Sequence, residues 1–61
     1  MISDLIEKNI DLLNEAIEYA LEDINEIESK NVTTHNEDRR LELAEQFIAK
    51  CEQQIQELKA L

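Results

Sequence analysis

Few residues of this 61-residue chain have side chains that could do chemistry. His35 is the only histidine and Cys51 the only cysteine. A metal site needs further ligands at suitable spacing, and no second histidine or Glu-x-x-His pattern accompanies His35. A reactive thiolate needs a cationic, partly exposed setting, whereas Cys51 lies between Ile48 and Ile55 on an apolar repeat. We therefore expect a solvated histidine, a buried cysteine (alternatively an intermolecular disulfide) and neither a metal nor a cofactor.

Acidic residues form the largest titratable group. Helical spacing places five of them on one polar face: Asp4, Asp11, Glu15, Glu18 and Glu22. Paired carboxylates act as acid and base only where a pocket separates their pKa values, which an open helix face does not do. Arg39-Arg40 is the only basic cluster, and the acidic residues beside it favour ion pairs over a phosphate contact. We expect no catalytic residue, no small-molecule substrate and no enzymatic activity.

The charge balance is strongly acidic. Fifteen Asp and Glu residues against six Lys and Arg residues give a formal net charge of −9. Such a surface repels nucleic acid and anionic lipid, because binding to either relies on Lys and Arg contacts with phosphate. The acidic face is therefore either a solubilising surface or a docking surface for a basic partner, and we expect no direct binding to nucleic acid or membrane.

The elements that position these residues follow from a seven-residue apolar repeat in each half of the chain. Steps of three and four residues keep side chains on one stripe of a helix, which no strand could do. The stripe of the first half comprises Ile6, Ile10, Leu13, Ile17, Ala20, Ile24 and Ile27. The stripe of the second half comprises Leu41, Ala44, Ile48, Cys51, Ile55 and Leu58. Together these two stripes, the seam, predict the core of an all-α antiparallel two-helix hairpin.

Local signals set the expected boundaries within a single domain of residues 1–61. The chain has no glycine and no proline, which favours nearly continuous helix. We expect the first helix over about residues 3–29 with Ser3 as its N-cap, a turn over 30–34, and the second helix over 35–60. Asn31 is the predicted left-handed C-terminal cap. Thr34 and Glu37 fit a capping box.

The hairpin register brings Asp23 opposite Arg40 and leaves an apolar surface beyond the seam. If the turn centres near residue 32, residues whose numbers add to about 63–65 lie level, and Asp23 then meets Arg40. Six further apolar residues widen the stripe to one side: Leu5, Leu12, Ala16, Tyr19, Leu43 and Phe47. A two-helix contact needs only a narrow seam, so a stripe of this width predicts another helical surface upon it. We expect dimerisation into a four-helix bundle, with these six residues at the interface.

These observations favour a non-catalytic protein–protein interaction module. We expect a small acidic hairpin that associates with itself and acts as a regulator, adaptor or inhibitor of another protein. One alternative is an acidic nucleic-acid mimic that blocks a DNA- or RNA-binding protein. A second is a small chaperone or adaptor subunit completed by a heteromeric partner. Met1–Ile10 lacks the charge pattern of a signal peptide, so we expect a cytoplasmic protein, either bacterial or in a host cytosol if phage-encoded.

Overall fold

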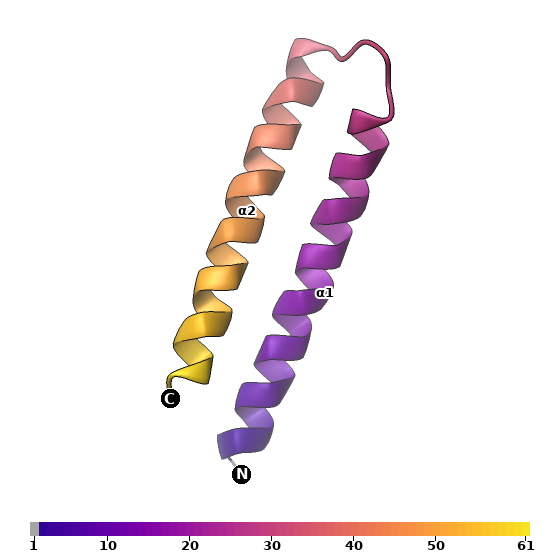
Figure 1. The fold of residues 1–61 in the computed structure, drawn as a ribbon. Coiled ribbons are helices and arrows are strands. Elements are labelled where there is room, and N and C mark those ends of the chain that lie inside the picture. The colour runs from indigo at the N-terminus through magenta and orange to yellow at the C-terminus, as the bar shows by residue number, and fades with distance from the viewer. Residues whose placement is uncertain (1) are drawn as a thin grey trace.

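The chain forms an antiparallel helical hairpin, which confirms the predicted all-α fold (Figure 1). The computed structural model describes residues 2–61, with α1 over Ile2–Glu28 and α2 over His35–Lys59. The two helices lie side by side, and the start of α1 and the end of α2 lie at the same end of the hairpin (Figure 1). The hairpin is a thin rod, with principal extents of 48 × 14 × 12 Å.

The seam between α1 and α2 holds the buried side chains. Ile24, Ile27, Cys51 and Ile55 are buried, and Ile27 is the most enclosed with 2% of its surface exposed. The nine other seam residues are half-buried. Two helices can cover only one side of each other, so most seam side chains keep an edge in solvent. The hairpin alone is therefore a single layer of two helices with only a small buried core.

The start of α2 is fixed by the predicted capping box, which the structure confirms. Thr34 has extended backbone angles (φ −81°, ψ 164°) and precedes the first turn. The backbone N–H of Glu37 donates to Thr34 Oγ1 over 3.1 Å, and the backbone N–H of Thr34 donates to Glu37 Oε1 over 3.0 Å. Thr33 Oγ1 also donates to Asp38 Oδ1 over 2.6 Å. The two capping-box bonds satisfy backbone N–H groups that have no intrahelical partner at the start of α2.

Two predictions about helix ends are wrong. Ser3 lies inside α1, one residue after its first helical residue, and so is not the N-cap. Asn31 does not adopt a left-handed conformation, since no residue among 2–61 has a positive φ. The end of α1 is closed by other means: the N–H of Ser29 donates to the Asn25 carbonyl, and Ser29 Oγ donates to the Glu26 carbonyl over 2.7 Å. The connection is long enough to turn without a tight left-handed cap.

Candidate protein-interaction face

One broad side of the hairpin carries the six residues predicted for an interface, hereafter the apolar face: Leu5, Leu12, Ala16, Tyr19, Leu43 and Phe47. Five are large apolar side chains that remain exposed to solvent, from 45% for Phe47 to 72% for Tyr19. Ala16 is half-buried. Leu5, Leu12 and Tyr19 are spaced seven residues apart on α1, so they form one stripe beside the seam. Together with Leu43 and Phe47 on α2, this stripe exposes five large apolar side chains on one side of the hairpin.

A groove runs between α1 and α2 in the middle of the apolar face. Its volume is about 780 Å³, and it is lined by Ala16, Tyr19, Ala20, Asp23, Arg40, Leu43, Ala44 and Phe47. The groove exists because three of these positions are alanine, whose methyl groups leave space between the larger side chains on either helix. Side chains of a docking helix could enter it as knobs enter holes.

The loop end of the groove is bounded by an ion pair across the helices. Arg40 Nη2 donates to Asp23 Oδ1, as the hairpin register predicted. The side chains of Arg40 and Asp23 are 55% and 35% exposed, so the pair contributes little to stability. Its chief effect is on the surface: the one carboxylate that lines the groove has a guanidinium partner, which leaves the groove lining without a net charge.

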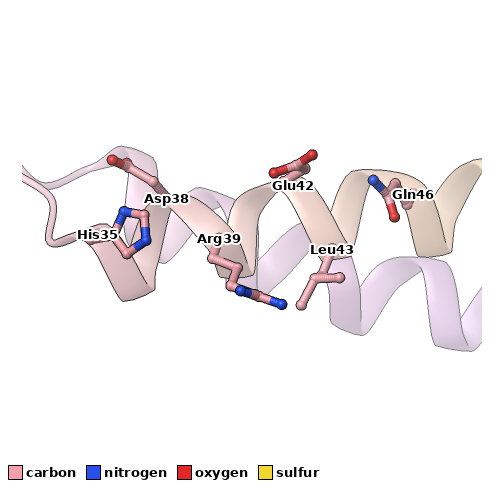
Figure 2. Close-up of a pocket in the computed structure, with 6 residues that line it drawn as sticks. All are labelled: His35, Asp38, Arg39, Glu42, Leu43 and Gln46. Carbon is pink, nitrogen blue, oxygen red and sulfur yellow. The ribbon is translucent and has the colours of Figure 1, made fainter.

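A second hollow lies on α2 alone and does not resemble a binding site. It has a volume of about 300 Å³ and is lined by His35, Asp38, Arg39, Glu42, Leu43 and Gln46 (Figure 2). In Figure 2 the Arg39 side chain extends toward Leu43, whereas the carboxylates of Asp38 and Glu42 point away from the Arg39 guanidinium. Arg39 forms neither of the two ion pairs found within residues 2–61. A binding site needs a few polar groups that converge on a ligand. All residues that line this hollow come from the single helix α2, so their side chains diverge from its surface.

The predicted acidic face is present on α1. Asp4, Asp11, Glu15, Glu18 and Glu22 are all exposed, and none of them takes part in an ion pair among the residues that the structure describes. The face points away from the seam, so its carboxylates remain hydrated. Such a surface carries long-range electrostatic attraction or repulsion but has no enclosed geometry.

Sequence reasoning missed one ion pair at the loop, between Lys30 Nζ and Glu37 Oε2. Together with the backbone N–H of Thr34, the Lys30 ammonium lowers the pKa of Glu37 from 4.5 to about 2. The pair joins the loop to the first turn of α2. The sequence predicted that Glu37 belongs to the capping box. Its contact with Lys30 depends on the path of the loop, which no local motif specifies.

The other candidate residues lie apart from the apolar face. His35 is exposed at the start of α2, and the free thiol of Cys51 is buried in the seam. Within residues 2–61 no three His, Cys, Asp or Glu side chains are grouped so that they could hold a metal ion, and neither helix is apolar enough to cross a membrane. No protein family, curated protein or solved structure that was compared with the chain matches it.

Proposed function

We propose that this chain is a non-catalytic protein–protein interaction module, a self-associating helical hairpin that regulates, adapts or inhibits another protein. The observation that carries the proposal is the apolar face, where Leu5, Leu12, Tyr19, Leu43 and Phe47 stay exposed in the isolated hairpin. Soluble proteins seldom leave five large apolar side chains together on one side of a small domain. A second helical surface on this face would remove them from water.

The energetics support association. Fully burying one large apolar side chain contributes ~1.5–3 kcal/mol. Five such side chains on each of two surfaces, already partly shielded, give a gross gain comparable with the ~4–15 kcal/mol lost in translational and rotational freedom. The hairpin's own core holds four buried side chains, and a chain of this size rarely exceeds ~3–5 kcal/mol without a staple or a partner. Folding and association are therefore expected to be coupled.

Sedimentation equilibrium tests the self-association. We expect a dimer at micromolar concentration, with a melting temperature that rises with protein concentration because assembly stabilises the folded state. Tyr19→Ala and Phe47→Ala should weaken the dimer, whereas Val32→Ala should not, because Val32 is an exposed apolar residue of the loop. A folded 7.1 kDa monomer with concentration-independent melting would contradict self-association and would favour a hairpin completed by a heteromeric partner.

Action on another protein needs a separate test. Affinity capture from the native host should recover one partner with the wild-type hairpin and with Val32→Ala, but not with Tyr19→Ala. The binding of that partner should then be measured with purified components at low and high salt. Apolar docking predicts an affinity that hardly changes with ionic strength. Equal capture by Tyr19→Ala would place the partner on another surface.

The acidic face supports a second candidate function, that of a nucleic-acid mimic. Its five carboxylates are exposed along one helix of a 48 Å rod. This row of negative charges resembles the phosphates of a nucleic-acid strand. Changing Glu15, Glu18 and Glu22 together to Gln should leave the fold intact, because surface substitutions usually change stability by less than ~0.5 kcal/mol each. For a mimic, the triple variant should bind its partner more slowly and with a weaker salt dependence. An unchanged association rate at two salt concentrations would exclude this candidate.

A further inference from the structure

We propose that a second copy of this chain covers the apolar face in an antiparallel arrangement, with the two loops at opposite ends and the two Leu12 side chains in contact at the two-fold axis. This inference rests on the self-association proposed above and specifies its geometry. The dimer would be a four-helix bundle in which α1 packs against α1 of the second copy and α2 against α2. Its interface is isologous, so each contact occurs twice except at the axis.

The apolar stripe of α1 has the symmetry that such an interface requires. In an antiparallel two-fold contact centred on residue 12, residues whose numbers add to about 24 lie opposite each other. Leu5 then meets Tyr19 of the second copy, and Leu12 meets its own equivalent. All three side chains are more than 60% exposed in the isolated hairpin. The stripe is thus self-complementary about its own midpoint, with a large apolar side chain opposite another at each of these three positions.

The charges beside this stripe are complementary about the same point. Lys8 lies four residues before Leu12 and Glu15 lies three residues after it, so both side chains border Leu12 on the helix surface. Both are exposed, and neither forms an ion pair among residues 2–61. Because 8 and 15 add to 23, the antiparallel arrangement brings Lys8 of each copy beside Glu15 of the other. Two symmetric ion pairs would then flank the axis.

The area available is close to what a stable dimer needs. One broad side of the hairpin measures 48 × 14 Å between Cα extents. Its projected area is therefore on the order of 700 Å² before side chains widen it, compared with ~800 Å² per partner in interfaces of standard size. Asp23 is the one acidic residue that lines the groove, and its carboxylate is paired with Arg40. A second copy therefore meets no buried repulsion there.

The other two-fold arrangement, with both loops at the same end, leaves Leu12 at the centre of the α1 stripe without an apolar partner. The Asp23–Arg40 pair shows that α1 and α2 residues whose numbers add to about 63 lie level. In that arrangement α1 would pack on α2 of the second copy, and Leu12 would face the polar side chains of Lys50 and Gln54. Leucine loses the apolar partner that the antiparallel arrangement supplies. The charges alone do not decide, because Lys8 and Glu15 would then face Glu57 and Lys50.

Disulfide trapping tests the two-fold axis directly. Leu12→Cys in a Cys51→Ala background, mildly oxidised, should give a covalent dimer, because helices packed ~8–10 Å apart bring facing Cα atoms at the axis within disulfide range. Leu21→Cys is the matched control: Leu21 is also an exposed leucine of α1, and its spacing of nine residues from Leu12 places it on the opposite side of the helix. A dimer by mass that Leu12→Cys fails to trap would overturn the arrangement and leave the proposed function standing. A monomer by mass would overturn both.

Charge exchange at Lys8 and Glu15 is a second test that keeps Cys51 in place. Lys8→Glu and Glu15→Lys should each raise the dimer Kd roughly tenfold, because each substitution creates two like-charge contacts. The double variant should restore the wild-type Kd, since the antiparallel pairs are then re-formed with reversed sign. In the arrangement with both loops at one end, the double variant would repel Glu57 and Lys50 and bind more weakly than either single variant. That result, or unchanged Kd values in all variants, would overturn the proposal.

Discussion

Replacing Ile27 by valine should destabilise the hairpin, whereas the same replacement at Ile2 should have almost no effect. The two residues belong to the same helix, but Ile27 is 2% exposed and Ile2 is 78% exposed. Ile27→Val removes one methylene from a fully enclosed position and leaves a small void there. Ile2→Val removes it from a side chain that is already in water. The chemical change is identical, so the comparison tests the difference in burial.

The magnitude follows from this difference in burial. Isoleucine-to-valine truncation at buried sites typically costs ~0.5–1.5 kcal/mol. A change of 1 kcal/mol shifts the melting temperature of a 60–100-residue domain by roughly 4–8 °C, so Ile27→Val should lower it by about 2–12 °C. Ile2→Val should stay within ~0.5 kcal/mol of wild type. A larger truncation such as Ile27→Ala, at ~2–5 kcal/mol, would consume most of the stability that a chain of this size possesses.

Helix content followed by circular dichroism during thermal unfolding measures both variants. The three proteins should be compared at one concentration, because a coupled dimer melts at a temperature that depends on concentration. Equal shifts for Ile27→Val and Ile2→Val would refute the burial order on which the seam rests. A larger shift for Ile2→Val would place the enclosed end of the hairpin at the chain termini instead of near the loop.

Two further predictions concern the start of α2. Thr34→Ala should lower the free energy of unfolding by ~0.5–2 kcal/mol, because the backbone N–H of Glu37 loses its acceptor; an unchanged urea midpoint would contradict the capping box. The Glu37→Gln variant should have a lower melting temperature than wild type at neutral pH. The lowered pKa of Glu37 gives a stabilisation that is fully present above pH 4.5 and is lost as the pH falls toward about 2. The melting temperatures of wild type and Glu37→Gln should therefore converge near pH 2. A difference in melting temperature that stays constant from pH 7 to pH 2 would contradict the Lys30 contact.

Sequence alone predicted the hairpin because its signals are periodic and local. A repeat of three and four residues specifies the helical stripe that must be covered, and Ile24, Ile27, Cys51 and Ile55 are the side chains most enclosed. The capping box of Thr34 was equally accessible, since both of its hydrogen bonds lie within four consecutive residues. Such features need no knowledge of the loop path.

The helix ends were predicted less well because several groups compete to satisfy them. Ser3 has the right chemistry for an N-cap, yet the helix extends beyond it, and helix ends are the least determined part of any such prediction. Asn31 was the best candidate for a left-handed cap, but Ser29 satisfies the Glu26 carbonyl at the end of α1 through its own hydroxyl. The Lys30–Glu37 ion pair connects the two sides of the loop, so predicting it would have required the path of the loop. The six residues of the apolar face could be grouped from sequence, whereas what covers them could not.

The thin core and the apolar face are two consequences of the same geometry. Ile17 and Ile48 occupy the middle of the seam, yet both remain half-buried because only one neighbouring helix covers each of them. A second layer on the apolar face would enclose the groove beside them, where Ala16 and Ala44 leave space for its side chains. Stability and partner binding would then depend on the same surface. Substitutions of Tyr19 or Phe47 that prevent association should therefore also lower the melting temperature, although neither side chain belongs to the hairpin's own buried core.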